Sequence, residues 1–210
     1  MTKRLEFIFD FGSPNAYLAY RALPPILART GAELAIRPCL LGGLFKLTDN
    51  RPPLVAFAGV KGKVEYEKLE IKRFIAKHGL TKFRMNPHFP VNTLMLMRGA
   101  VAARFEDMFD RYFRAAYHHM WVEPKKMDDL EIFRNAFIAS GIDIDRLIAR
   151  AQQDDVKKKL IEDTTDAVNR GAFGSPTFFV GREMFFGKDQ LRDVEEEIME
   201  QTGTLRSRIA

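Results

Sequence analysis

The sequence has a single cysteine, Cys39, among its 210 residues. One thiol cannot form a disulfide within the chain, cannot make a Cys-x-x-Cys redox pair, and cannot supply the thiolates of a structural zinc site. This argues against a thiol–disulfide oxidoreductase, and any thiol chemistry must use a thiol brought in from outside. We expect Cys39, which follows Pro38 at the end of a predicted strand, to be a small buried hydrophobic side chain.

Long apolar runs and clusters of one charge are also missing. No stretch approaches the roughly 20 apolar residues of a membrane span. Residues 1–4 are basic, but a strand interrupted by Glu6 and Asp10 follows them, which is not the pattern of a signal peptide. The net charge of +5 comes from Lys and Arg spread along the chain. We therefore expect a cytoplasmic protein that binds small anionic ligands, with no membrane or nucleic-acid partner.

The N-terminal stretch carries the clearest pattern that is present. Residues 5–11 alternate Leu and Phe with other residues, which predicts a strand with one face fully buried. Gly12 permits a tight turn, Ser13 is a favoured helix N-cap, and Pro14 suits the first helical position. Ser13 is thus expected at a helix N-terminus, where α/β sheets bind ligands and the helix dipole favours anions. Taken alone, this junction favours a Ser13 that is only a cap.

The rest of the chain predicts two sheet-forming ends around a helical block. A helix that Pro24 and Pro25 must kink or restart and a strand ending at Pro38 follow the first strand, and residues 39–62 carry the signals of a long irregular loop. Two short strands at residues 177–180 and 183–186 and a final helix capped by Asp189 close the chain. Helices are predicted between them at about residues 63–77, 96–103, 105–121, 130–140, 144–151 and 154–169. This order predicts an α/β fold, a thioredoxin-like domain of residues 1–45 and 165–210 with an all-helical insertion over residues 46–164.

Three stretches of the sequence resemble one family. Residues 9–19 (FDFGSPNAYLA), 171–178 (GAFGSPTF) and 186–189 (FGKD) are similar to the bacterial 2-hydroxychromene-2-carboxylate isomerases and the related kappa-class glutathione transferases. Residues 86–100 and 120–121 also resemble this family, so the resemblance spans nearly the whole chain. It implies a thioredoxin-like fold of the DsbA and kappa-transferase type, glutathione as cofactor, and a homodimer.

The resemblance also implies roles for the three stretches. Ser13 would hold the place of the first cysteine of a thiol oxidoreductase and, with Asn15 beside it, contact bound glutathione, whose thiolate the Ser13 hydroxyl would stabilise. Ser175 would precede a cis Pro176 and pair through its backbone with the cysteinyl part of glutathione. Without the resemblance, Ser175-Pro176 is explained as an ordinary turn at the entry to a strand. In Lys188-Asp189, Asp189 would accept a hydrogen bond from the γ-glutamyl amine of glutathione, in addition to capping the last helix.

The loop and the helix after it supply further predicted contacts. Asn50 corresponds to a family asparagine beside the thiol, although it is also explained as a turn residue. Lys61, Lys63 and Lys68 lie where the family holds basic side chains facing carboxylates. Lys63 is included in the predicted site while the choice among the three stays open, and each is also explained as helix surface.

His118 and His119 are adjacent, so on a helix their side chains point about 100° apart. Unlike a pair four residues apart, they are not expected to chelate one metal ion. We predict one surface histidine, one core histidine and no metal site.

The function that follows from the resemblance is a glutathione-dependent cis–trans isomerase of aromatic catabolism. It would interconvert 2-hydroxychromene-2-carboxylate and trans-o-hydroxybenzylidenepyruvate, or act on a related small aromatic carboxylate. A kappa-type glutathione transferase and a non-catalytic thioredoxin-fold binding module are the alternatives. Met and Phe are frequent between residues 96 and 121, which fits a homodimer interface or, equally, the core of the insertion.

Overall fold

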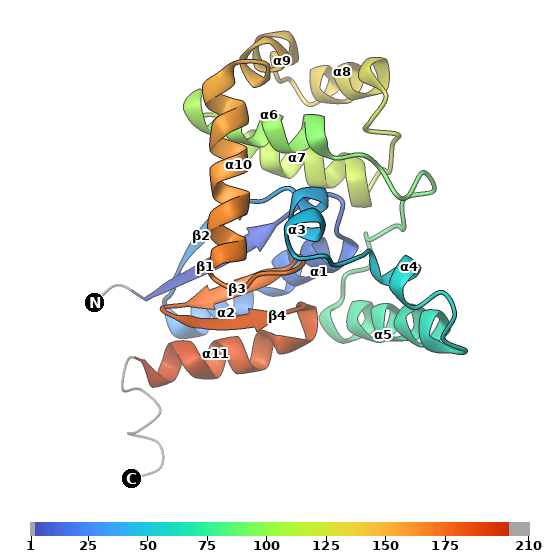
Figure 1. Ribbon diagram of the computed structural model, residues 1–210, viewed down its shortest axis with the longest axis vertical. Coiled ribbons are helices and arrows are strands. Elements are labelled where there is room, and N and C mark those ends of the chain that lie inside the picture. Colours follow the sequence, from blue (N-terminus) through green and yellow to red (C-terminus); the bar gives the residue numbers. More distant parts are fainter. Residues whose placement is uncertain (1–2, 202–210) are drawn as a thin grey trace.

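The computed structural model describes residues 3–201 and contains a four-stranded mixed sheet in the order β2-β1-β3-β4 (Figure 1). Strand β2 runs parallel to β1, whereas β3 is antiparallel to β1, and β4 is antiparallel to β3. In the central strand, Phe7 is paired with Ile36 on one side and Phe178 on the other. The strands are β1 (Arg4–Phe9), β2 (Glu33–Pro38), β3 (Thr177–Val180) and β4 (Glu183–Phe186).

Strand β1 is buried on both faces. Phe7 and Phe9 are fully buried in the main core, as the alternation predicts, but Ile8 is buried as well, in a second cluster with Cys39 and Phe179 on the other side of the sheet. The burial of Cys39 is confirmed. Strand β1 ends at Phe9, two residues earlier than predicted, because the next carbonyl, that of Asp10, already accepts a turn hydrogen bond from the Ser13 amide.

The helix predicted after this strand is divided into α1 (Pro14–Ala22) and α2 (Pro24–Thr30). Leu23 separates them, because Pro24 and Pro25 have no N–H with which to continue the ladder. At the other end of the chain, a short 3₁₀ helix η1 (Lys188–Gln190) packs against α1, and α11 (Leu191–Glu200) packs against α2 and β3. The two chain ends therefore form one layered unit around the sheet.

The loop predicted over residues 39–62 is wrong in part, because it contains α3 (Leu41–Leu47) and α4 (Pro53–Ala56). Helix α3 forms although it contains two glycines, which are poor helix formers. It packs against α10 (Asp154–Asn169), and a Cβ added at Gly43 would lie 3.1 Å from the Thr164 methyl group. Close helix packing between distant segments thus overrides a weak local propensity.

Helices fill the chain between α4 and β3, as predicted. Helices α6 and α7 lie above the sheet, α8 and α9 lie beyond them at the top of the view, and α5 lies to the side below α4 (Figure 1). Within residues 3–201, no helix is long and apolar enough to cross a membrane. The division of the chain at residues 46 and 164 stays a prediction. The helices are α5 (Lys63–His78), α6 (Leu94–Phe105), α7 (Phe109–Trp121), α8 (Leu130–Ala139), α9 (Ile144–Ala151) and α10.

An aromatic cluster joins β1 to the helical layer. The ring of Phe9 lies 5.0 Å from that of Phe113, and the ring of Phe11 lies 5.0 Å from that of Tyr117, both edge to face. The Trp121 indole N–H donates to the Phe11 carbonyl at 2.8 Å. The apolar side chains of α6 and α7 are therefore largely used in the core of the chain itself, so their frequency gives no support to a homodimer, which stays a prediction.

Candidate functional site

Ser13 lies at the N-cap of α1, as predicted, directly after the turn that follows β1. Its Oγ accepts a hydrogen bond from the Ala16 amide at 3.1 Å and donates to the Ser175 carbonyl at 2.8 Å. A hydroxyl has a single proton to donate, so the Ser175 carbonyl uses the donor of Ser13 in this state. The residue is only 5% exposed, which gives the hydroxyl a partly dehydrated setting at the positive end of a helix.

Asp10 is the residue of this region that the sequence analysis missed. Its carboxylate is fully buried and accepts from the Gly12 amide at 2.8 Å and the Leu41 amide at 2.7 Å. Burial raises the pKa of Asp10, and hydrogen bonds from these two amides and from Thr93 oppose the rise. The carboxylate therefore ties together the β1–α1 turn, the start of α3 and the start of α6.

Ser175 and Pro176 lie directly beside Ser13. The Ser175 Oγ accepts from the Asp10 amide at 3.1 Å, and the Ser175–Pro176 peptide bond is cis, as the resemblance implies. The Pro176 carbonyl accepts from the Gly187 amide at 2.9 Å, which brings the third stretch to the same place. The first, second and third sequence stretches, far apart in the chain, therefore meet at one end of the sheet.

Lys188 and Asp189 form a close ion pair. The buried Lys188 ammonium lies 2.7 Å from both Asp189 oxygens and 5.1 Å from the ring centre of Phe74 in α5. The prediction that Asp189 caps the last helix is wrong: it lies inside η1, and α11 starts at Leu191 without a side-chain cap. The Asp189 side chain is 62% exposed, which leaves its outer lone pairs open to a second donor.

The two predicted asparagines differ in their bonding. The Asn15 Oδ1 is buried and has no hydrogen-bond partner in the part of the chain that the structure describes. Asn50 is engaged on both sides, because its Nδ2 donates to the Phe173 carbonyl at 2.9 Å and its Oδ1 accepts from the Arg51 amide. Asn15 therefore offers a free acceptor, whereas Asn50 braces the loop that leads to Ser175.

Lys63 is the predicted site residue that lies apart from the others. Its ammonium is 3.6 Å from Glu67 and 5.1 Å from the ring centre of Phe57. Lys188 meets α5 at Phe74, and at 1.5 Å per residue Lys63 lies roughly 16 Å from Phe74 along this helix. Lys61 and Lys68 are exposed. The structure thus gathers Ser13, Asn15, Ser175, Pro176, Lys188 and Asp189, with Asn50 bracing the group and Lys63 at its outer side.

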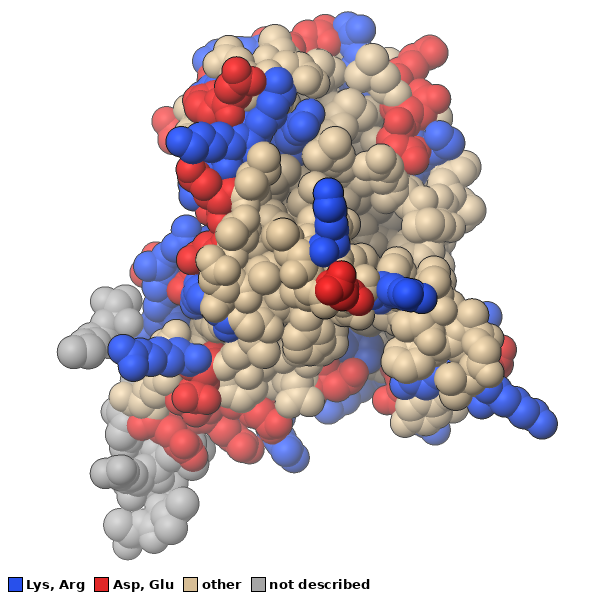
Figure 2. All heavy atoms as spheres, in the orientation of Figure 1, with Lys and Arg blue, Asp and Glu red and all other residues tan. Residues whose placement is uncertain are grey.

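Exposed aromatic side chains border this group. The Phe173 and Phe186 rings are 4.5 Å apart and remain 38% and 42% exposed. The Phe186 ring fills the space where a Cβ would project from Gly174, so a side chain there would displace it. Figure 2 shows that the face carrying α3, α4 and β4 has few charged side chains, whereas charges crowd the two ends of the molecule. Such a border suits an aromatic or apolar ligand.

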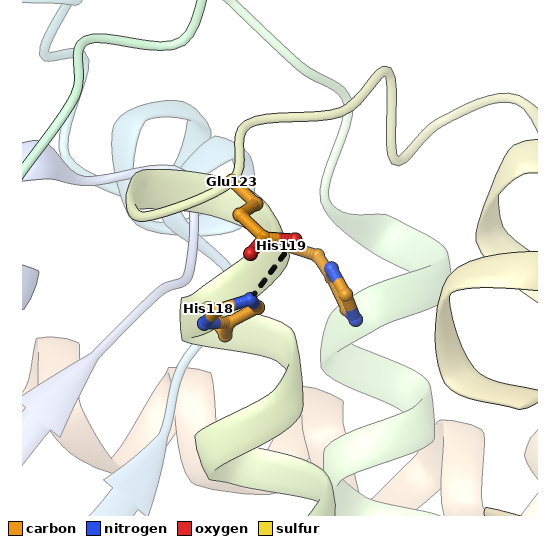
Figure 3. Close-up of side chains that lie close together, drawn as sticks. All are labelled: His118, His119 and Glu123. Atoms are coloured by element: carbon orange, nitrogen blue, oxygen red, sulfur yellow. Dashed lines mark ion pairs between the residues drawn. The ribbon is translucent and has the colours of Figure 1, made fainter. Parts of the chain in front are cut away.

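The two adjacent histidines are divided as predicted, with His119 buried and His118 partly exposed. Burial first, and then the charges of Lys125 and His118, lower the pKa of His119 to about 4. Their ring centres are nevertheless only 5.0 Å apart, and Glu123 approaches both rings (Figure 3). Both histidines lie within α7, which ends at Trp121, and the turn after this helix brings Glu123 back toward them.

A capping serine, a cis-proline loop and a central strand, meeting where the sheet ends, define a thioredoxin-like domain that lacks the redox cysteines. The profile of the DsbA-like thioredoxin domain matches residues 4–199, and the chain belongs to this family.

Similar proteins support the fold and indicate a class of activity. The chain is 28% identical over 205 residues to a 2-hydroxychromene-2-carboxylate isomerase of Sphingobium xenophagum, covering 95% of this chain and 100% of that protein. It is 26% identical to glutathione S-transferase kappa 1 of Rattus norvegicus, covering 89% and 87%. The solved structure of a 2-hydroxychromene-2-carboxylate isomerase superposes with a TM-score of 0.78 at 23% identity, over 99% of both chains. The predicted thioredoxin-like fold is confirmed, and these relatives are isomerases and glutathione transferases.

Proposed function

We propose that this protein is a glutathione-dependent cis–trans isomerase that interconverts 2-hydroxychromene-2-carboxylate and trans-o-hydroxybenzylidenepyruvate, or a related aromatic keto acid. The observation that carries this proposal is the buried Ser13 hydroxyl, which stands at the N-terminus of α1 and faces the Ser175 carbonyl at 2.8 Å. The isomerase that is similar over 95% of the chain supports the choice of substrate class.

The polar groups around Ser13 fit a small peptide such as glutathione. The Asn15 Oδ1 is a buried acceptor without a partner, and a buried acceptor gains most from a ligand N–H. Asp189 is exposed on the side away from Lys188 and can accept a ligand amine. The Ser175 carbonyl would face the central peptide unit. These three acceptors match the amide and amine donors of the proposed cofactor.

Thiolate stabilisation is the main chemical task of this chain. When bound, glutathione would supply a thiolate that adds reversibly to the conjugated double bond, which removes the barrier to rotation about it. An ordinary thiol has a pKa of about 8.5 and is only a few per cent ionised at neutral pH. The Ser13 hydroxyl and the positive end of the α1 dipole would stabilise the negative charge.

The Ser13 hydroxyl must change its acceptor to do this. At present its proton is directed to the Ser175 carbonyl. A carbonyl oxygen has two lone pairs, so a ligand N–H can donate to the Ser175 carbonyl as well, and a neighbouring anion, as the stronger acceptor, would draw the hydroxyl proton away. Rotation about one bond is sufficient, because the cap bond from the Ala16 amide uses a lone pair and not the proton. Ligand binding would thus itself make the donor available.

The remaining residues would bind the substrate and exclude water. Phe173 and Phe186 offer an aromatic surface next to Ser175, and Asn50 fixes Phe173 through its carbonyl. Lys188 neutralises one side of Asp189. We propose that Lys63 contacts a ligand carboxylate at the outer side of the site, because it lies far along α5 from Phe74, the residue next to Lys188. We also propose that the protein acts in the cytoplasm as a homodimer.

A kappa-type glutathione transferase is the second candidate, favoured by the 26% identity to the rat enzyme over most of both chains. It would use the same glutathione site but release a conjugate. Mass spectrometry of the reaction separates the two, because an isomerase regenerates free glutathione and leaves no thioether product.

The test combines calorimetric titration with glutathione and an absorbance assay of 2-hydroxychromene-2-carboxylate with and without it. We expect binding in the millimolar range or tighter and isomerisation that requires glutathione. Asp189→Asn should weaken binding, whereas Asp193→Asn, on the neighbouring helix, should not. Absence of binding at millimolar glutathione contradicts the proposal, and binding without turnover of either kind indicates a non-catalytic module.

A further inference from the structure

The end of α7 brings three possible metal ligands together. The His118 Nε2 lies 3.3 Å from the Glu123 Oε2, and one ligand atom from each of His118, His119 and Glu123 lies within 4.8 Å of the other two. Figure 3 shows that the Glu123 carboxylate points toward the two rings. None of these residues belongs to the group around Ser13, so they are not explained by the proposed isomerase function.

The turn that carries these side chains is held by its own backbone. The Glu123 amide donates to the His118 carbonyl and the Lys125 amide to the His119 carbonyl, both at 2.9 Å. The buried side chain of Asn86 donates to the Lys125 carbonyl at 3.0 Å from outside the turn. The backbone positions from which the three side chains project are therefore held by hydrogen bonds.

His119 is oriented in the manner of a metal-binding histidine. The Ser140 hydroxyl donates its proton to the Ala136 carbonyl at 3.1 Å, so it accepts from the His119 Nε2 at 2.9 Å. The Nε2 is then the protonated nitrogen, and the lone pair of Nδ1 faces the cluster. Ligating histidines almost always donate their second N–H to a fixed acceptor in this way.

A positive charge already lies in the cluster. The Lys125 ammonium is 3.1 Å from the His119 Nδ1 and 3.8 Å from the Glu123 Oε2. The same lone pair and the same carboxylate that would bind a metal ion therefore now face an ammonium group. Lys125 is on a flexible stem at the surface, so it can move away when a more strongly bound cation arrives.

We propose that His118, His119 and Glu123 form a binding site for a divalent transition-metal ion of the Zn²⁺ type, which displaces the Lys125 ammonium. Neighbouring ligands of a tetrahedral zinc ion lie roughly 3.3 Å apart, since zinc–nitrogen bonds are about 2.0–2.1 Å. The His118 and Glu123 atoms already have this spacing. Imidazole ligands select Zn²⁺, Co²⁺, Ni²⁺ or Cu²⁺ over Mg²⁺ and Ca²⁺, and three protein ligands leave a fourth position for water.

The experiment uses the full chain without a histidine tag, stripped with a chelator. Titration with Co²⁺ should produce visible absorption bands of low-symmetry Co²⁺, and Zn²⁺ should remove them with one equivalent. His118→Ala and Glu123→Gln, both at accessible positions, should each weaken Zn²⁺ binding by about tenfold or more. Lys125→Met should strengthen it severalfold, because the competing ammonium is gone. His88→Ala, which removes an exposed histidine elsewhere, is the matched control and should change nothing.

Three results would overturn the proposal. The first is a wild-type chain that gives no Co²⁺ bands and no Zn²⁺ heat. The second is an equal loss in His88→Ala and His118→Ala, which indicates scattered binding to surface histidines. The third is weaker Zn²⁺ binding in Lys125→Met, which makes the lysine part of the structure and not a competitor. A melting curve of each variant in chelator verifies that it is folded.

Discussion

Ser13→Ala separates two roles of one hydroxyl, the capping of α1 and the stabilisation of a bound thiolate. As a cap, the Oγ pairs with the Ala16 amide and the Ser175 carbonyl. Loss of an N-cap costs about 1 kcal/mol, and a buried carbonyl left without its donor adds roughly another 1 kcal/mol. A chain of this size loses about 2–4 °C of melting temperature per kcal/mol, so we expect the melting temperature to fall by roughly 4–8 °C.

The second role has a different signature. A hydrogen bond from a hydroxyl to a charged acceptor contributes roughly 1.5–3 kcal/mol, and one pKa unit corresponds to about 1.4 kcal/mol. The pKa of bound glutathione should therefore rise by about one to two units in Ser13→Ala. Isomerase turnover at neutral pH should fall by the corresponding factor, about ten- to a hundredfold. The affinity for protonated glutathione at low pH should change little. Thiolate absorbance near 240 nm, followed against pH, measures the shift directly.

Asp129→Ala provides the matched control. Asp129 is also an N-cap, that of α8, and its carboxylate accepts from the Glu131 and Ile132 amides. Its removal costs only the cap, about 1 kcal/mol, and should lower the melting temperature by roughly 2–4 °C and leave the thiol titration unchanged. If Ser13→Ala behaves in the same way, with a lower melting temperature and an unshifted thiol, then Ser13 is a structural cap and the reasoning about the thiolate is refuted.

Three further results are expected. Asp10→Asn should lower the free energy of unfolding by about 1–3 kcal/mol in urea titrations. The asparagine side chain has only one acceptor oxygen, whereas the backbone N–H groups of Gly12 and Leu41 donate to two different oxygens of Asp10. A negligible loss would contradict this. Burial opposes ionisation of Glu6, but the hydrogen bond and charge of Arg170, followed by Arg37, hold its pKa below the usual 4.5. The stabilisation from this pair is therefore present above pH 4.5 and lost as pH falls through the lowered pKa. Arg170→Met should cost up to about 1 kcal/mol at neutral pH and nothing near pH 2, whereas an equal cost at both would assign the effect to its packing on Phe179. Light scattering should give twice the chain mass of 24.1 kDa, and the mass of one chain at micromolar concentration would contradict the proposed dimer.

Periodicity predicted the elements whose positions are set by local burial. The alternation in residues 5–9, the helix of residues 154–169 and the hairpin at Gly181 all appear where the pattern places them. Helix α3 could not be found in this way, because its two glycines signal a loop and the contact that favours the helix is with the distant Thr164. The same holds for the early end of β1, which a hydrogen bond to the Asp10 carbonyl decides.

The candidate site was predicted by resemblance more than by pattern. Nothing in the local sequence brings Ser13 to Ser175, 162 residues away, yet their hydrogen bond is central to the site. Asp10 was missed because an acidic residue alternating with Phe is typical of a solvent-facing strand position, whereas it lies in the turn after β1, buried against the Gly12 and Leu41 amides. Glu123 was missed because its approach to His118 depends on a backbone turn beyond the end of a helix.

The bonding of Ser13 also favours a donor over a nucleophile. A serine nucleophile needs a base to take its proton, but the acceptor here is the Ser175 carbonyl, which is not a base. A hydroxyl can accept from the Ala16 amide and donate at the same time, whereas a thiolate at this position could only accept. Serine thus keeps the helix start intact and retains one proton for an external anion. This donor therefore fits the proposal that the reactive sulfur is that of a bound thiol.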